Sequence, residues 1–335
     1  MKNILNHLLS GRILDSGEAS EALYIIGRGE ANAAQMAAFI TVYLMRPLSA
    51  EELAGFRMAM LELCIPFNLD GIPAIDMCGT GGDGKKTFNI STTSAFVVAG
   101  AGVPVAKHGN YGVSSSCGSS TVMEALGYKF TSDSSALLKQ IEQAGICFLH
   151  APLFHPVMKN VGAVRRDLGV RTFFNMLGPL VNPARPPFQM TGVFSLELAR
   201  LYNYIFQNQN RPLQYSVVHS LDGYDEVSLT APVRILSSSG ERQPIPADFN
   251  SVTLQDTDLA SGGSAAESAD ILVNILSGKG TLAQTNVVLA NAALALQTAD
   301  NALSLQDALA LARESIDSGK ALISLEKVIS ISAAA

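Results

Sequence analysis

Residues 76–92 read DMCGTGGDGKKTFNIST and place four glycines, several hydroxyl side chains and an acid between a short apolar run and a longer one. The pattern of residues 74–78 predicts a buried strand, and that of residues 91–100 predicts a helix. Glycines let an anion approach backbone N–H groups, and a helix start adds unpaired N–H groups and the positive end of its dipole. The segment therefore predicts a strand–turn–helix unit that binds phosphate or pyrophosphate.

The glycines alone leave a simpler interpretation open, because a Gly-rich turn between a strand and a helix is often only a connection. The turn does not match the P-loop pattern G-x-x-x-x-G-K-[ST], and it lacks the companion acid of the G-x-G-x-x-G turn in dinucleotide-binding proteins. The sequence thus does not support a P-loop NTPase or a dinucleotide enzyme. Specificity has to come from segments further along the chain.

A second loop of the same kind lies at residues 104–120, PVAKHGNYGVSSSCGSS. Loops that follow adjacent parallel strands meet at one edge of the sheet, where open α/β folds bind ligands. Together, GTGGD and KHGN…SS resemble motifs of the anthranilate phosphoribosyltransferases, a family of tryptophan biosynthesis. Residues 164–183, VRRDLGVRTFFNMLGPLVNP, and residues 219–226, HSLDGYDE, are two further blocks in family order. The resemblance covers nearly the whole chain.

The composition of the 335-residue chain bounds its function. A formal net charge of −6 and a pI near 5.4 leave no overall attraction for nucleic acid or acidic lipid. The four cysteines have no C-x-x-C spacing, which favours free thiols. The N-terminus is a poor signal peptide, and the most apolar stretch, residues 95–106, is too short to span a bilayer. We expect a soluble cytoplasmic protein with no nucleic-acid or membrane partner.

The pattern along the chain changes at about residue 70. The segment before it has helical periodicity, including a capping box at Ser49–Glu52, whereas strand-like runs alternate with helical patterns after it. Predicted strands are residues 74–78, 103–107, 146–149, 190–194 and 216–219; residues 233–247 favour a surface hairpin, and residues 265–276, 282–297 and 305–318 favour helices. The predicted fold class is α/β, a mainly parallel sheet flanked by helices with a smaller all-helical domain.

The resemblance refines this organisation. It implies a nucleoside phosphorylase-like fold in which the helical domain, residues 1–70, takes in a mid-chain insertion near residues 165–190. Residues 71–335 then form the domain that binds 5-phosphoribosyl 1-pyrophosphate (PRPP). In agreement with an insertion, residues 172–181 favour a helix that ends before Asn182-Pro183. The resemblance also implies a homodimer formed through the helical domain.

The resemblance implies a set of site residues as well. Catalytic roles fall to Lys107, Asp83 and Arg165. The substrate-binding residues are Gly79, Gly82, Asp83, Thr87, Asn89, Ile90, Ser91, Thr92, Lys107, His108, Gly109, Asn110, Tyr111, Gly112, Val113, Ser114, Ser115, Ser119 and Arg165. A lysine is a suitable point charge against phosphate. The simpler alternative for Lys107 is an exposed lysine at a strand end.

Asp225 and Glu226 are adjacent acids that follow a predicted strand. Mg²⁺ binds proteins through one or two carboxylates and otherwise keeps water and substrate phosphates. The resemblance implies two Mg²⁺ ions per chain, held by Asp225, Glu226 and the hydroxyl of Ser91. On residue type alone, the pair can equally be a solvated acidic turn.

Arg165 is the candidate for binding the acceptor. A planar guanidinium can hold a benzoate carboxylate with two hydrogen bonds, and the family places an arginine at this motif position for anthranilate. Asn110 and Gly79 would line the same pocket. The aromatic amine of anthranilate is a neutral nucleophile, so no strong general base is needed. We assign proton transfer to none of the histidines at 108, 150, 155 and 219.

The chain departs from the family pattern at two places. Tyr111-Gly112 stands where Arg-Ser is commonest, and Thr121 stands where an acid is frequent. The loss of an arginine beside a polyanion site puts the detailed contacts of this loop and the donor affinity in question. The reaction class does not depend on it.

Three hypotheses of function follow. The first is transfer of the phosphoribosyl group from PRPP to anthranilate. The second is a pyrimidine nucleoside phosphorylase, whose fold is similar, although the acid pair and the Arg165 block favour pyrophosphate and a carboxylated acceptor. The third is a non-enzymatic relative that binds nucleic acid. The negative net charge of the chain counts against this hypothesis.

Overall fold

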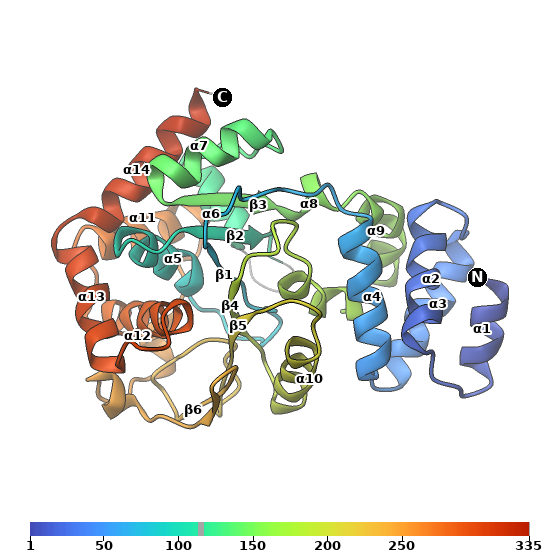
Figure 1. Ribbon diagram of the computed structural model, residues 1–335. Coiled ribbons are helices and arrows are strands. Elements are labelled where there is room, and N and C mark those ends of the chain that lie inside the picture. The colour runs from blue at the N-terminus through green and yellow to red at the C-terminus, as the bar shows by residue number, and fades with distance from the viewer. Residues whose placement is uncertain (113–116, 335) are drawn as a thin grey trace. The chain divides into compact units, whose positions relative to one another are not determined.

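The computed structural model describes residues 1–112 and 117–334 (Figure 1). The chain divides into a helical unit, Met1–Phe67 with Ala151–Arg185, and an α/β unit, Asn68–His150 with Pro186–Ala335. The inserted part of the helical unit thus begins at Ala151 rather than near residue 165, because the helices that follow Ala151 pack on helices of the N-terminal segment. No helix among the described residues has the length and apolarity needed to cross a membrane.

The helical unit consists of α1 (Lys2–Leu9), α2 (Ser16–Gly27), α3 (Ala33–Met45), α4 (Ala50–Glu62), α8 (Ala151–Phe154), α9 (Val157–Leu168) and the 3-10 turns η1 (Phe173–Met176) and η2 (Gly178–Leu180). The capping box predicted at Ser49–Glu52 is confirmed at the start of α4. The helix expected over residues 172–181 is wrong. Gly178-Pro179 interrupts it, because proline lacks the N–H that an α-helix needs and the turns remain short.

An aromatic cluster holds the helical unit together. The rings of Phe56 and Phe173 stack with their centroids 4.6 Å apart, while Phe39 and Tyr43 meet both of them edge to face. Such pairs contribute about 0.5 to 1.5 kcal/mol each beyond the burial of their surface. The cluster joins α3 and α4 to η1, so it ties the inserted segment to the N-terminal helices.

Glu52 is a fully buried acid beside this cluster. Its carboxylate accepts hydrogen bonds from Arg46, 2.5 Å away, from the Tyr43 hydroxyl at 3.1 Å and from the backbone N–H of Leu14 at 3.2 Å. Burial by itself raises the pKa of Glu52, but the hydrogen bonds from Arg46, Ser49 and Leu14 outweigh it and hold the pKa below its usual value. The acid therefore stays charged and paired.

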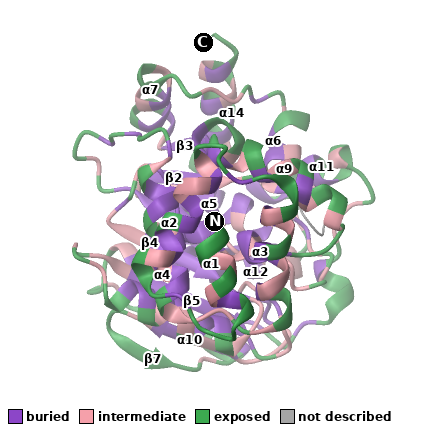
Figure 2. Cartoon of the chain, turned by 90° about the vertical axis from the view of Figure 1, so that its right-hand side faces the viewer, coloured by how far each residue is buried: buried purple, intermediate pink, exposed green. Residues whose placement is uncertain are grey.

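The α/β unit is built on one seven-stranded sheet of order β3-β2-β1-β4-β5-β6-β7. Its strands are β1 (Ile75–Met77), β2 (Val105–Gly109), β3 (Ile146–His150), β4 (Phe188–Gly192), β5 (Gln214–Ser220), β6 (Val233–Ser237) and β7 (Gly240–Arg242). The first five pair in parallel, and the last two add an antiparallel hairpin at the edge. All five predicted strands and the predicted hairpin are confirmed; β7 is exposed (green in Figure 2).

Helices cover both faces of the sheet (Figure 1). They are α5 (Ile90–Gly100), α6 (Ser119–Ala125), α7 (Ser134–Ala144), α10 (Leu196–Gln207), α11 (Ala265–Leu276), α12 (Leu282–Ala299), α13 (Leu305–Asp317) and α14 (Lys320–Ala333). α5 and α12 pack on the central strands and on one another, and α10 packs on β5 and β6. The sequence predicted α11, α12 and α13 closely but left the tail unassigned, where α14 lies.

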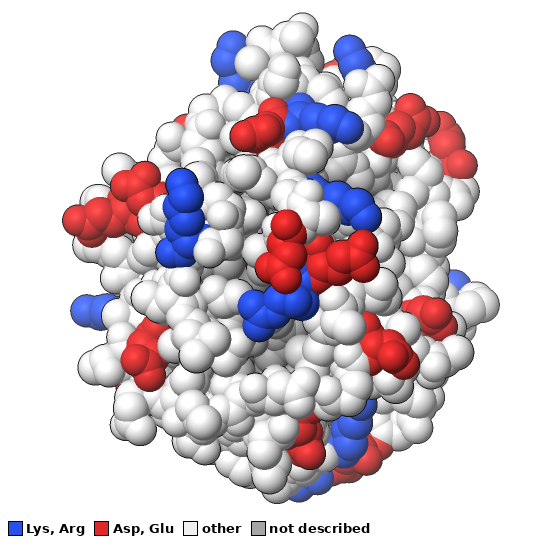
Figure 3. All heavy atoms as spheres, turned by 90° about the vertical axis from the view of Figure 1, so that its left-hand side faces the viewer, with Lys and Arg blue, Asp and Glu red and all other residues white. Residues whose placement is uncertain are grey.

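The described surface and thiols agree with the composition. On the face shown in Figure 3, basic and acidic side chains are interspersed among neutral ones. The four cysteines are free, as predicted. The observed architecture confirms the predicted fold class, a mainly parallel sheet with flanking helices and a helical domain.

Candidate active site

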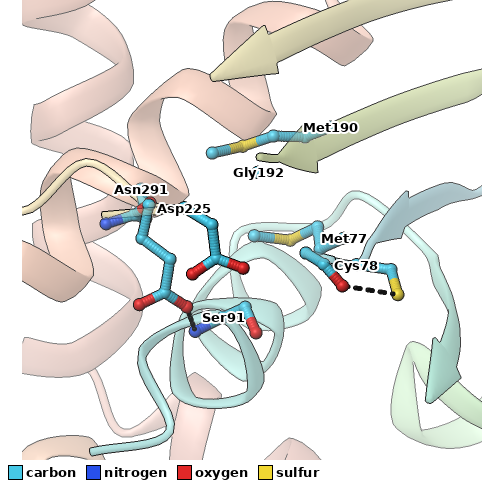
Figure 4. Close-up of a pocket in the computed structure, with 9 residues that line it drawn as sticks. Met77, Cys78, Ser91, Met190, Gly192, Asp225 and Asn291 are labelled. Carbon is cyan, nitrogen blue, oxygen red and sulfur yellow. Dashed lines mark hydrogen bonds between the residues drawn. The ribbon is translucent and has the colours of Figure 1, made fainter. Parts of the chain in front are cut away.

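A small pocket opens at the carboxyl ends of β1 and β4, which are neighbours in the sheet. From β1 the chain proceeds outward through β2 and β3 on one side, and through β4 and β5 on the other, so the strand order reverses here. Ligands of open α/β sheets bind at such a switch point. The lining residues are Met77, Cys78, Gly79, Ser91, Met190, Gly192, Asp225, Glu226 and Asn291 (Figure 4).

The glycine turn enters the pocket directly after β1. Gly81, Gly82 and Gly84 have φ of +60°, +81° and +76°, which side chains disfavour, so these positions need glycine. Gly79 needs it for another reason, since a Cβ there would lie 2.7 Å from the Asp225 carboxylate. The turn leads into α5, whose N-cap Asn89 does not cap the helix with its side chain. The start of α5 therefore keeps backbone N–H groups for other partners.

Two carboxylates accept hydrogen bonds from backbone N–H groups, one in the glycine turn and one at the start of α5. Asp225 Oδ2 accepts a hydrogen bond from Gly81 N at 2.7 Å, and Glu226 Oε1 accepts one from Ser91 N at 3.0 Å. Figure 4 shows the Asp225 carboxylate directed toward the helical turn that carries Ser91. The sequence pattern placed the acids after β5 and the glycines after β1; the fold brings them together in one pocket.

The surroundings of Asp225 and Glu226 disfavour the charged forms of both carboxyl groups. Burial raises the pKa of Asp225, and the nearby Asp83 charge raises it further. Burial also raises the pKa of Glu226, with the Asp225 and Asp83 charges adding to the effect. A divalent cation would relieve this repulsion, and Ser91 contributes a hydroxyl beside it. Among residues 1–112 and 117–334 no group of three or more His, Cys, Asp or Glu could hold a metal ion. Two carboxylates and a hydroxyl fit Mg²⁺, which needs few protein ligands.

Lys107 lies beneath the turn. Its side chain is only 2% exposed, and its ammonium donates to the carbonyl of Met77 and lies 3.5 Å from the Ser91 hydroxyl. The alternative of an exposed strand-end lysine is therefore wrong. The ammonium thus lies between the end of β1 and the start of α5.

The second loop begins at the end of β2. The carbonyl of Asn110 accepts hydrogen bonds from Ser119 Oγ at 3.2 Å and Ser120 N at 3.3 Å, which brings the loop back to the start of α6. His108 is buried, and its backbone N–H donates to the Asp76 carboxylate at 3.0 Å. The predicted binding residues Val113, Ser114 and Ser115 lie outside the described residues.

Other predicted residues of the α/β unit lie on the glycine turn or on α5, whereas Gly109 ends β2 and Tyr111 and Gly112 follow in the second loop. Asp83 accepts a hydrogen bond from Lys85 N at 3.0 Å, and Thr87 forms a bridge with Ala260. Ile90 and Thr92 are buried in the first turn of α5. They support the helix start rather than line the pocket.

Comparison with known proteins identifies the family. A model described as "Glycosyl transferase family, a/b domain" matches residues 71–322, and one described as "Glycosyl transferase family, helical bundle domain" matches residues 2–64. A protein of Christiangramia forsetii named anthranilate phosphoribosyltransferase is 56% identical over 332 residues, 99% of each chain. One of Flavobacterium johnsoniae with the same name is 54% identical, covering 99% of this chain and all of the relative. The chain belongs to the anthranilate phosphoribosyltransferase family.

Solved structures of anthranilate phosphoribosyltransferases agree with this assignment. The Saccharomyces cerevisiae enzyme in complex with PRPP and Mg has a TM-score of 0.92 at 30% identity, with 99% of this chain and 98% of that chain covered. The Thermus thermophilus enzyme has a TM-score of 0.89 at 33% identity, with 98% and 99% covered. These relatives support the first of the three hypotheses and not the phosphorylase or the nucleic-acid-binding alternative.

Arg165, the acceptor candidate in this phosphoribosyltransferase, belongs to the helical unit. It lies in the last turn of α9, where its Nη2 donates to Asn175 Oδ1 at 3.2 Å and its guanidinium lies 5.5 Å from the centre of the Phe174 ring. Burial lowers the pKa of Arg165 from its usual value. Its neighbour Arg166 is exposed.

Sequence reasoning missed five of the lining residues, Met77, Cys78, Met190, Gly192 and Asn291. Of these, Gly192 and Asn291 contact the acid-pair segment. Asn291, buried in the apolar helix α12, accepts from Val227 N at 3.1 Å and donates to Val227 O at 2.9 Å, which anchors the residue after the acid pair. An amide side chain in the middle of an apolar run, VVLANAALAL at residues 287–296, was the available signal. Gly192 lies so close to Asp225 that a Cβ would be 1.5 Å from its carbonyl oxygen; no local pattern marks this contact.

Proposed function

We propose that this chain transfers the 5-phosphoribosyl group of PRPP to the amine of anthranilate, giving N-(5-phosphoribosyl)anthranilate and pyrophosphate, a reaction of tryptophan biosynthesis. The observation that carries the proposal is the meeting of the glycine turn, the start of α5 and the acid pair at the switch point of the sheet. That constellation combines donors for a polyanion with oxygen ligands for the cation that accompanies it.

The donor's pyrophosphate would bind the first turn and the start of α5. In the reaction, the bond between ribose C1 and the pyrophosphate oxygen breaks, and a bond from C1 to the anthranilate nitrogen forms. Negative charge grows on the leaving group, so N–H groups and a cation directed at it lower the barrier. Gly81 N and Ser91 N, which now donate to Asp225 and Glu226, are such groups. Phosphate oxygens would compete with the carboxylates for them.

Asp225, Glu226 and Ser91 would hold Mg²⁺, and we propose two ions per chain. When bound, Mg²⁺ supplies positive charge that offsets the charge of the departing pyrophosphate. Asp83 raises the pKa of both acids, so it belongs to the same electrostatic cluster. Lys107 would add a fixed positive charge under the phosphate-binding turn.

Arg165 would hold the carboxylate of anthranilate. The position of the guanidinium is already set by Asn175 and Phe174, so little freedom is lost on binding. The attacking amine is neutral and becomes positively charged as the C1–N bond forms. Its proton can leave to solvent, and the proposal needs no histidine base.

We further propose that the chain is a cytoplasmic homodimer that associates through its helical domain, residues 1–70 with the insertion. Large apolar side chains exposed on this unit support an interface there: Leu9, Ile13 and Met45 are 71%, 60% and 84% exposed. Burying such side chains against a second copy would remove apolar surface from water, which favours association. Sedimentation equilibrium should give a mass near twice the 35.3 kDa of one chain, and a monomer at micromolar concentration would contradict the dimer.

A fluorescence assay tests the reaction. The purified chain should consume anthranilate when PRPP and Mg²⁺ are both present, and should not when either is omitted. Phosphorolysis of thymidine or uridine by the same preparation, with no loss of anthranilate fluorescence, would instead establish the phosphorylase.

A further inference from the structure

Tyr111 directly follows Asn110 in the second loop. Its side chain is engaged in the protein. The hydroxyl donates to Glu124 Oε1 on α6 at 2.7 Å, and this bond raises the pKa of the Tyr111 hydroxyl. The ring meets His150, at the end of β3, edge to face with centroids 5.0 Å apart. Tyr111 thus joins the loop to α6 and to β3.

His150 is a fixed platform for this contact. It is buried, its Nδ1 lies 2.9 Å from the Ser120 hydroxyl, and its ring stacks on Phe130 with centroids 4.4 Å apart. Glu124 and Ser120 both belong to α6. The tyrosine ring and hydroxyl are therefore held by groups that are themselves in place.

The two ends of the second loop also touch one another. A Cβ on Gly118 would lie 2.0 Å from Gly112 N and 2.5 Å from the Tyr111 carbonyl carbon. Gly118 has an ordinary φ of −77°, so close approach alone requires glycine there. Asn89, at the start of α5, donates to the carbonyl of Cys117 at 3.1 Å. This closed base links the second loop to the first anion-binding turn.

We propose that Tyr111 and Glu124 are positioning residues for PRPP: their hydrogen bond closes the base of the second loop and so holds Asn110 and its neighbours in the donor-binding arrangement. The inference rests on the proposed function. It assigns a role to Glu124, and it gives the Tyr111 side chain a task within the protein in place of contact with the substrate. Because the pair is exposed, its effect should be modest, and it should fall on the donor alone.

The test compares Tyr111→Phe, Glu124→Ala, Glu124→Gln and the double variant Tyr111→Phe/Glu124→Ala. Removing the hydroxyl or the carboxylate should raise the KM and the calorimetric Kd for PRPP about two- to fivefold, which is about 0.4 to 1 kcal/mol. The kcat, the anthranilate KM and the melting temperature should stay at wild-type values. Glu124→Gln keeps an acceptor oxygen and should restore affinity to within about twofold.

A double-mutant cycle isolates the pair. The double variant should be no weaker than either single variant, because both remove the same bond. Tyr204→Phe, which changes an exposed tyrosine on α10, is the matched control and should leave PRPP affinity unchanged. Gly118→Ala should weaken PRPP binding by about tenfold, more than either single variant of the pair, because the added Cβ would push the two ends of the second loop apart.

Unchanged PRPP affinity in Tyr111→Phe, or additive effects in the double variant, would overturn the inference. If the wild type binds PRPP but does not consume anthranilate, the proposed function fails, while the PRPP Kd values still decide the role of the pair. If the wild type does not bind PRPP in the presence of Mg²⁺, both are refuted.

Discussion

Replacing Arg165 by alanine should damage acceptor binding selectively. In the structure the guanidinium is partly buried, hydrogen-bonded to Asn175 and placed over the ring of Phe174. These contacts fix the direction in which its remaining N–H groups point. Alanine removes both the charge and the planar fork that suits a carboxylate. Lysine at 165 would keep the charge but lose the second hydrogen bond and the ring contact.

The magnitude follows from the type of bond. A hydrogen bond to a charged group is worth about 1.5 to 3 kcal/mol, or roughly tenfold to a hundredfold in affinity. Partial burial of Arg165 weakens competition from water and favours the upper part of this range. We expect the anthranilate KM of Arg165→Ala to rise by that factor and the PRPP KM to change less than twofold. Arg165→Lys should lie between the variant and the wild type.

Steady-state kinetics with each substrate varied in turn, followed by anthranilate fluorescence, provides the measurement. Arg166→Ala is the matched control, because it removes an exposed arginine one residue away on the same helix. The reasoning is refuted if Arg165→Ala keeps the wild-type anthranilate KM, or if Arg166→Ala raises it equally.

Three further outcomes are expected. Asp225→Asn/Glu226→Gln should lose most of kcat and the rise in melting temperature on adding Mg²⁺, yet fold as well as the wild type, because repulsion among buried acids disappears; an unchanged Mg²⁺ response would contradict the metal role. Lys107→Met should weaken PRPP binding about tenfold or more in calorimetry, because a buried charge under the turn is removed; wild-type affinity in a folded variant would exclude that role. Glu52→Ala should cost about 3 kcal/mol in urea unfolding, the lower end for a broken buried pair, because Arg46 keeps access to water. The pKa of Glu52 is lower in the folded state than in the unfolded state. The Arg46–Glu52 pair therefore adds its full share to the free energy of unfolding above the unfolded-state pKa, and this share is lost as pH falls through the folded-state pKa. Equal stability of variant and wild type at neutral pH would contradict this role.

Local patterns predicted most elements of the fold. Alternating and helical periodicities depend on neighbours a few residues apart, and they located the five parallel strands and helices such as α11. They failed where a local interruption competes with the pattern, as at Gly178-Pro179, which leaves two short 3-10 turns. The extent of the inserted segment was also beyond them, because packing on α2 and α3 decides it.

The sequence by itself determined which residue types this protein has for its chemistry: glycines after β1, a lysine on β2 and an acid pair after β5. Only the tertiary structure decided which of them meet. Asp225 accepts from Gly81, 144 residues away, and Glu226 from Ser91, 135 residues away. The order of strands sets these meetings, because β4 and β5 add to β1 on the side opposite β2. Tyr111 and Glu124 likewise meet because the second loop turns back on α6, a contact that no periodicity in the sequence specifies.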